Sequence, residues 1–135
     1  MNQAYLKAGV TNENLRKALV AQSALESGWG ARSLGGGDYN YGNITLGSAK
    51  NRNYREAWDH DAQGNNIKQK FRNYDSVDDF IQDKMNLLSK RYKVDFSKDN
   101  ESSYFDKVIK GGYAEDPYYR SRLNDMYKSV LGRWS

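Results

Sequence analysis

The stretch Ala21-Gln22-Ser23-Ala24-Leu25-Glu26-Ser27-Gly28-Trp29-Gly30 ends a helical pattern in the first quarter of the chain. Behind it, one face of the predicted helix recurs at steps of three and four residues. This face is made of Leu15, Ala18, Leu19, Gln22 and Leu25. Gly28 and Gly30 then stop the helix. Glu26 therefore lies in its last turn, at the border of the apolar face.

A carboxyl group at that border can be partly desolvated. Desolvation raises a carboxyl pKa because it disfavours the charged form. A carboxylic acid that keeps its proton near neutral pH can act as a general acid. The alternative is a solvated glutamate on an ordinary helix, and position alone favours that alternative. Chemistry at Glu26 therefore needs support from elsewhere in the chain.

The remaining pattern predicts a mainly helical α+β domain with one hairpin. Alternation on either side of the turn at 63–66 predicts two strands, and Ser76 with Asp79 forms a variant capping box. Asp116 followed by Pro117 predicts a helix start, with the carboxylate as its cap. The expected helices are 2–9, 12–28 (capped by Thr11 or Asn12), 77–91, 102–110 and 117–131, and the expected strands are 53–61 and 67–73.

Length and composition limit the class of protein. The 135 residues predict a single domain, 1–135, with 38% hydrophobic and 28% charged residues. Eleven tyrosines, four phenylalanines and three tryptophans suit carbohydrate binding, core packing or nucleic-acid stacking. The net charge of +4 favours a polyanionic partner such as nucleic acid or an anionic cell wall. The basic residues are scattered, however, which indicates a mixed, solvated surface.

The sequence lacks the residues that several kinds of catalytic and binding site require. The chain has no cysteine, and His60 is its single histidine, so neither a zinc site nor a serine–histidine triad is expected. No GxxxxGK phosphate loop occurs. We expect no metal and no cofactor. The N-terminus lacks a signal-peptide pattern, and no run approaches the length of a membrane span. The domain was either cut from a larger secreted protein or travels by another route, such as phage delivery.

The motif at 21–30 resembles the signature of bacterial and phage peptidoglycan hydrolases of the N-acetylglucosaminidase type, glycoside hydrolase family 73. The resemblance implies that Glu26 is the catalytic acid. It also implies a lysozyme-like helical domain whose small β-hairpin lobe flanks the active-site cleft. Tyr54-Arg55-Glu56 stands where the family often has Thr-x-Glu on the first hairpin strand, so Glu56 is the expected second carboxylate. A solvated strand acid is an equal alternative, and Asp59 and Asp61 are substitutes if the register is shifted.

Two further segments carry the resemblance. Residues 111–119 resemble Gly-Tyr-Ala-Thr-Asp-Pro-x-Tyr, which implies that Tyr113 lies in the cleft beside the acid. Residues 39–44 resemble the groove-lining block Asn-Asn-Leu-Phe-Gly-Ile-Lys, with Thr45 in place of the lysine. Asn40 and Asn43 are then candidates for binding sugar, although asparagine beside glycine is also turn chemistry. Tyr41 and Trp58 can stack on sugar rings, with core packing as the alternative for Trp58. Trp29 is expected in the core.

The prediction is a monomeric peptidoglycan hydrolase that cleaves the β-1,4 bond after N-acetylglucosamine in glycan strands, outside the cell, at the wall or after phage delivery. Muramidase and lytic transglycosylase are the enzymatic alternatives on the same fold. A non-catalytic cell-wall-binding module is the alternative from another class. Nucleic acid and membrane are not expected partners.

Overall fold

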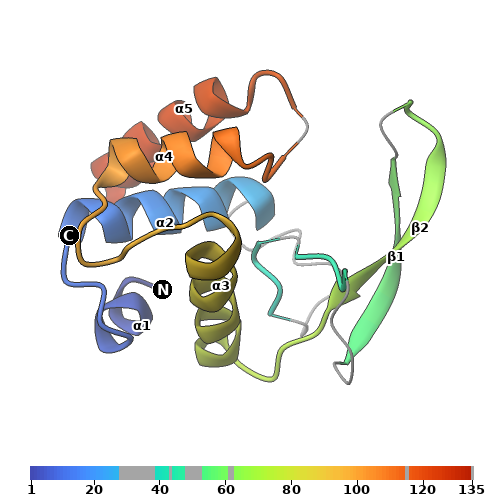
Figure 1. Cartoon of the computed structure of the whole chain (residues 1–135), viewed down its shortest axis with the longest axis horizontal. Coiled ribbons are helices and arrows are strands. Elements are labelled where there is room, and N and C mark those ends of the chain that lie inside the picture. The colour runs from blue at the N-terminus through green and yellow to red at the C-terminus, as the bar shows by residue number, and fades with distance from the viewer. Residues whose placement is uncertain (28–38, 43, 48–52, 61–62, 115, 135) are drawn as a thin grey trace.

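The computed structural model describes residues 1–27, 39–42, 44–47, 53–60, 63–114 and 116–134. Helix α2 runs through the middle of the helical body, with α4 and α5 on one side and α1 and α3 on the other (Figure 1). The hairpin stands beside this body. The elements are α1 (Asn2–Lys7), α2 (Glu13–Ser27), β1 (Tyr54–His60), β2 (Asn66–Arg72), α3 (Val77–Arg91), α4 (Glu101–Lys110) and α5 (Tyr119–Arg133).

Helix α2 is central because its buried face is wide. The predicted stripe is buried at Leu15, Ala18, Leu19 and Gln22, and Leu25 is half-buried. Asn12 caps the helix, since its Oδ1 accepts a hydrogen bond from Leu15 N at 3.1 Å. Of the two predicted caps, Asn12 is thus the correct one. Helices α5, α4 and α1 all pack against α2, which brings three other segments to the helix that carries Glu26.

Helices α3 and α4 begin at side-chain caps. Ser76 accepts from Asp79 N at 3.1 Å, as predicted, and Asn100 forms a complete capping box with Ser103. Both helices direct aromatic and aliphatic side chains into one core. The buried members of this core between residues 80 and 108 are Phe80, Ile81, Leu88, Tyr92, Val94, Tyr104, Phe105 and Val108.

The hairpin is antiparallel and its register pairs Glu56 with Lys70. A bridge between Thr45 and Phe71 joins the preceding segment to β2. An ion pair attaches β2 to α3, since Arg72 Nη1 lies 2.8 Å from Asp83 Oδ2. The predicted hairpin is confirmed, with each strand ending within one residue of its expected limits.

The predicted start of the last helix is wrong. Helix α5 begins at Tyr119, and Asp116 does not cap it. Instead, Asp116 Oδ1 accepts from Tyr118 N at 2.9 Å and its carbonyl accepts from Tyr119 N at 3.1 Å. Aspartate and proline form a turn ahead of the helix here, because the aspartate side chain bonds to the backbone two residues on. None of the described helices is long and apolar enough to cross a bilayer.

Candidate active site

Glu26 lies in the last turn of α2 and is half-buried. Its Oε1 accepts a hydrogen bond from the Tyr119 hydroxyl at 2.7 Å. Tyr119 is buried at the first residue of α5, so the packing of α2 against α5 sets this contact. A phenol that donates to a carboxylate stabilises the charged form. The structure therefore gives Glu26 a fixed orientation and a partner for its anion.

A buried chain of hydrogen bonds orients the Tyr119 hydroxyl. Gln22 is fully buried; its Nε2 donates to Tyr119 Oη at 3.1 Å, and its Oε1 accepts from the Tyr104 hydroxyl. Because the Tyr119 oxygen accepts from Gln22, its own proton is directed to Glu26. Three helices contribute to the chain: α4 supplies Tyr104, α2 supplies Gln22 and Glu26, and α5 supplies Tyr119.

The tyrosines of this chain stay neutral. Burial, and then the Glu26 charge, raise the pKa of Tyr119 far above its usual range. The pKa of Tyr113 is raised by the same two causes in the same order. Burial likewise raises the pKa of Tyr104, with smaller contributions from the surrounding groups, Glu26 among them. All three therefore act as hydrogen-bonding phenols rather than phenolates at neutral pH.

Tyr113, which the resemblance placed in the cleft, lies beside this chain of hydrogen bonds. Its ring stacks on Tyr119, with centroids 6.4 Å apart and planes 8° from parallel. Its hydroxyl donates to Gly42 O at 2.9 Å. An alanine Cβ at Gly42 would lie 2.9 Å from that hydroxyl oxygen, so the close approach requires glycine. The contact brings the segment around Gly42 to the Glu26 cluster.

Asn40 is buried and holds this segment in place. Its Nδ2 donates to Ile44 O and to Arg72 O, both at 2.9 Å, and its Oδ1 accepts from Ile44 N at 3.0 Å. The two bonds to Ile44 are those of a turn, and the bond to Arg72 O joins the segment to β2. Tyr41 is half-buried, edge-on to Phe80 with centroids 5.7 Å apart. Asn43, the third groove candidate, lies outside the described residues, as do Trp29 and Asp61.

Glu56 and Trp58 occupy alternate positions of β1 and are both exposed. Trp58 is 70% exposed, so the core alternative for this residue is wrong. The ammonium of Lys68, on the paired position of β2, lies 5.6 Å from its ring centroid. Glu26 and Glu56 thus come from different elements, a buried helix and an exposed strand, and the hairpin stands beside the C-terminal end of α2 (Figure 1).

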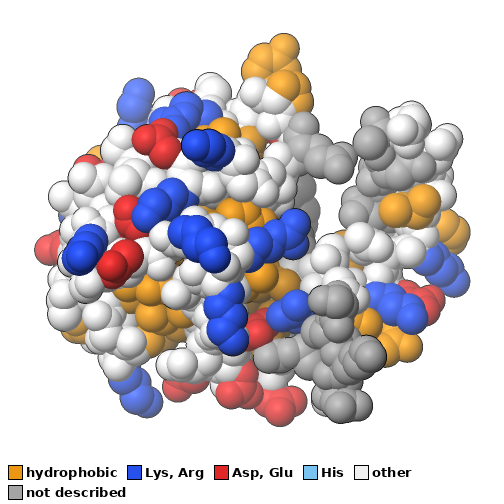
Figure 2. Space-filling view, viewed as in Figure 1, with side chains coloured by type: hydrophobic (Ala, Val, Ile, Leu, Met, Phe, Trp, Pro, Cys, Tyr) orange, Lys and Arg blue, Asp and Glu red, His pale blue; other side chains and the backbone are white. Residues whose placement is uncertain are grey.

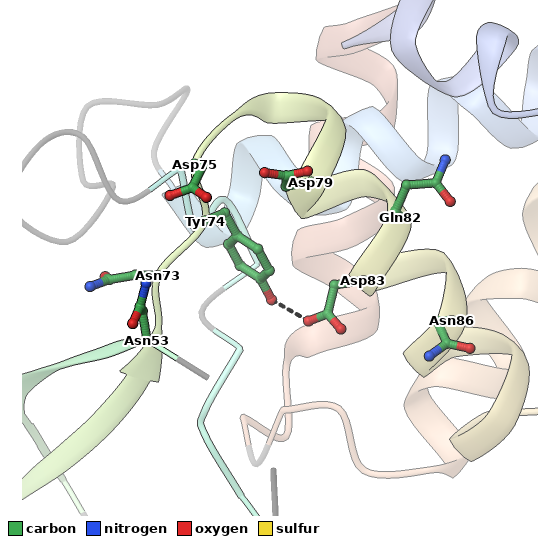
Figure 3. Close-up of a pocket in the computed structure, with 8 residues that line it drawn as sticks. All are labelled: Asn53, Asn73, Tyr74, Asp75, Asp79, Gln82, Asp83 and Asn86. Carbon is green, nitrogen blue, oxygen red and sulfur yellow. Dashed lines mark hydrogen bonds between the residues drawn. The ribbon is translucent and has the colours of Figure 1, made fainter. Parts of the chain in front are cut away.

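Two cavities flank the base of the hairpin. The larger, of about 600 Å³, is acidic and includes Asp75, Asp79 and Asp83, with Tyr74 bonded to Asp83 (Figure 3). Its lining includes neither Glu26 nor Tyr113. The smaller, of about 360 Å³, includes Tyr113 and Arg91, and its described lining residues include no acid. Among the described residues, no group of three histidine, cysteine or carboxylate side chains could hold a metal ion.

Sequence reasoning did not find Gln22, Tyr104 or Tyr119 as site residues. Gln22 carried a usable signal, because it is a polar residue on the apolar stripe, one helical turn before Glu26. Tyr104 and Tyr119 carried none that distinguishes them among eleven tyrosines. Their hydrogen bonds span 82 to 97 residues of sequence.

A family model and a known relative match most of the chain. Residues 2–131 match the family model Glucosaminidase, described as mannosyl-glycoprotein endo-β-N-acetylglucosaminidase. An autolysin of Enterococcus faecalis is 32% identical over a stretch covering 85% of this chain but 17% of the autolysin.

Solved structures show the same fold. A peptidoglycan hydrolase from Sphingomonas sp. A1 superposes with a TM-score of 0.72 at 32% identity, covering 87% of this chain and 78% of that one. The glycoside hydrolase domain of FlgJ from Salmonella typhimurium gives 0.69 at 26% identity, with coverage of 97% and 81%.

Proposed function

Because the chain belongs to the Glucosaminidase family of glycoside hydrolases, we propose that it hydrolyses peptidoglycan at the β-1,4 bond between N-acetylglucosamine and N-acetylmuramic acid. The observation that carries the proposal is the half-buried carboxyl of Glu26, held by the Tyr119 hydroxyl at 2.7 Å. Both the autolysin and the peptidoglycan hydrolase named above support the choice of substrate.

Glu26 is the general acid of the proposed reaction. As the bond between the anomeric carbon and the leaving oxygen breaks, its electron pair passes to that oxygen, which takes the Glu26 proton. A carboxylate is left on Glu26. The Tyr119 hydroxyl then donates to this anion, so the hydrogen bond is strongest when charge has developed. Water completes the reaction: its oxygen bonds to the anomeric carbon and its proton passes to a base.

Glu56 is the proposed base. It projects from an exposed strand and not from the Gln22–Tyr119 cluster, which suits a group that activates water across a gap rather than a nucleophile in contact with the sugar. The alternative is assistance by the acetamido group of the substrate, in which Glu56 is dispensable. A Glu56→Gln variant separates the two, because only the first route loses activity with it.

Tyr113 is proposed to position the sugar. Its hydroxyl proton is committed to Gly42 O, so its oxygen is left to accept a hydrogen bond, as from the N–H of an acetamido group. Trp58, exposed on the hairpin, offers a ring on which a sugar can stack. Among the earlier groove candidates, Asn40 has its amide bonded to the backbone, and we propose that it supports the groove rather than binds sugar.

We further propose a monomer that acts at the cell wall and needs no cofactor. Glycan strands are its only proposed partner. On the face shown in Figure 2, Lys and Arg side chains lie over the middle, and Asp and Glu side chains lie to the left and along the lower edge. A non-catalytic wall-binding module would use the same exposed aromatic residues, and the enzymatic alternatives are muramidase and lytic transglycosylase.

The test is digestion of purified peptidoglycan by the wild type and Glu26→Gln, followed by borohydride reduction and mass spectrometry of the released ends. The matched control is Asp125→Asn, which makes the same change of carboxylate to amide at an exposed position of α5. We expect reduced N-acetylglucosamine ends from wild type and control, and a loss of about 10²–10⁴-fold in rate for Glu26→Gln.

Each of the other possible outcomes would assign this protein a different activity. Reduced muramic ends would show a muramidase, and anhydro-muramyl ends would show a lytic transglycosylase. Binding to walls without release of any end by the wild type would show a binding module. Full activity of Glu26→Gln would refute the acid.

A further inference from the structure

Lys84 of α3 is fully buried, with 0% of its surface exposed. Its ammonium donates to Ser23 Oγ at 3.0 Å and reaches Leu19 O at 3.4 Å, both on α2. The rings of Tyr5 and Phe80 lie 5.9 and 5.8 Å away. A lysine is almost never fully buried without a partner of opposite charge. The hydrogen bonds and rings satisfy the donors but do not neutralise the charge.

The carboxylate that interacts electrostatically with Lys84 is that of Glu26. Ser23 and Glu26 are three residues apart on α2, which places their side chains on adjacent turns of one helix face, about 5–6 Å apart at Cβ. Since the ammonium is bonded to Ser23, it lies against α2 about one helical turn before the residue that carries the carboxyl. Burial lowers the pKa of Lys84 to about 7, and the attraction of Glu26 opposes that shift.

We propose that Lys84 is a positioning residue for the reaction: a buried cation behind Glu26 that favours the ionised carboxyl and so sets the pH above which the acid has lost its proton. The inference rests on the proposed function, because it assumes that Glu26 is the acid. Lys84 touches no reacting atom and acts only through Glu26.

The described phenols that face this pair stay neutral. They are tyrosines from each element packed around α2: Tyr5 from α1, Tyr104 from α4, Tyr113 from the turn after α4, and Tyr119 from α5. Burial raises the pKa of every one of them. The four tyrosines therefore remain neutral while Glu26 or Lys84 gains or loses a proton.

The charged neighbour of Lys84 in sequence has its own partners. Asp83 Oδ2 accepts from Arg72 Nη1 at 2.8 Å and from the Tyr74 hydroxyl at 2.5 Å. Asp83 is thus paired elsewhere, whereas the charge that acts on Lys84 is that of Glu26.

The first experiment is the pH profile of kcat/KM on peptidoglycan for the wild type and Lys84→Met. Methionine keeps an unbranched chain of similar length and removes the charge. Without the cation the ionised carboxyl loses its attraction, so the pKa of Glu26 rises. We expect the alkaline limb to move up by about one pH unit, the lower end of the effect of a close opposite charge. Lys90→Met, at an exposed position of the same helix, is the control and should not move the limb.

The outcome for Lys84→Met decides the inference separately from the proposed function. A folded variant whose alkaline limb superposes on that of the wild type overturns the role of Lys84, even if Glu26→Gln is inactive. An active Glu26→Gln overturns the acid itself. A shift of the limb to higher pH in Lys84→Met but not in Lys90→Met supports the inference, because only the first variant removes a positive charge close to Glu26.

A second measurement covers the case in which Lys84→Met does not fold. The coupling is reciprocal, so removing the Glu26 charge must lower the pKa of Lys84 below about 7. We expect the lysine side-chain NMR resonance of Lys84 to titrate at lower pH in Glu26→Gln than in the wild type. An unchanged midpoint would overturn the inference without any variant at Lys84.

Discussion

Tyr119→Phe is the sharpest test of the hydrogen-bond chain behind Glu26. The change removes one oxygen and keeps the ring that stacks on Tyr113. That oxygen accepts from Gln22 at 3.1 Å and donates to Glu26 at 2.7 Å. The substitution should therefore affect stability through Gln22 and ionisation through Glu26, with little loss of packing.

The cost in stability follows from Gln22. Its amide nitrogen is fully buried, and an unsatisfied buried donor costs about 1–3 kcal/mol. Unfolding entropy of about 2.1 cal/mol/K per residue gives about 0.28 kcal/mol/K for 135 residues. A loss of about 2 kcal/mol therefore lowers Tm by about 7 °C. The ionised form of Glu26 loses a donor as well, so its pKa rises and the alkaline limb of kcat/KM moves to higher pH.

The assays are calorimetric or circular-dichroism melting and a pH series of peptidoglycan hydrolysis. The control is Tyr118→Phe, which makes the same change at an adjacent residue that is 67% exposed, and which should leave Tm within about 1 °C, since surface substitutions cost little. If the Tm of Tyr119→Phe equals that of Tyr118→Phe, the buried hydrogen bond between Tyr119 and Gln22 does not contribute to stability as inferred. If its pH profile matches the wild type, Tyr119 does not act on Glu26.

Three further changes test the surroundings of the site. Gly42→Ala places a Cβ 2.9 Å from the Tyr113 hydroxyl, so it should lower the free energy of unfolding by about 1–3 kcal/mol and also lower kcat. The control Gly132→Ala meets open space and should leave the urea midpoint unchanged or higher. Asp83→Asn removes the charge that holds β2 to α3 and should cost about 3 kcal/mol in urea unfolding; a change below about 0.5 kcal/mol would contradict the ion pair. The pKa of Lys84 is lowered from 10.5 to about 7 on folding, so the unfolded chain binds the extra proton between these values and stability rises with pH there. Relative to Lys84→Met, the wild type should gain up to about 1.4 kcal/mol per pH unit above pH 7, and a constant difference would refute the buried ammonium.

The elements of the fold were predictable because their signals are local. Periodicity and caps such as Ser76 act within a few residues, and the helices and hairpin appear within two residues of most expected limits. The start of α5 was not predictable in the same way. Aspartate followed by proline favours both a cap and a turn, and the choice depends on where α4 ends and how α5 packs on α2.

In the candidate site, too, residues with a local sequence signal were predictable and residues defined by packing were not. The family motifs indicated Glu26 and Tyr113, and the structure places Tyr113 against Tyr119, the tyrosine that holds Glu26. The buried chain needed three helices in contact before its members could be identified. Lys84 did carry a signal, since it shares a face with Phe80 and Leu88 at steps of four residues. A lysine at that spacing is normally explained by its apolar stem reaching solvent, and only the packing of α1 and α2 over it excludes that explanation.

The last prediction concerns how Glu26, the proposed general acid, keeps its proton. Tyr119 and Lys84 both favour the carboxylate, yet proton donation needs the acid form. Glu26 is half-buried, so a bound sugar removes the remaining water and raises its pKa. The profile of kcat/KM reports the free enzyme and that of kcat reports the complex. The alkaline limb of kcat should therefore lie at higher pH than that of kcat/KM, and coincident limbs would mean that the substrate does not supply the missing desolvation.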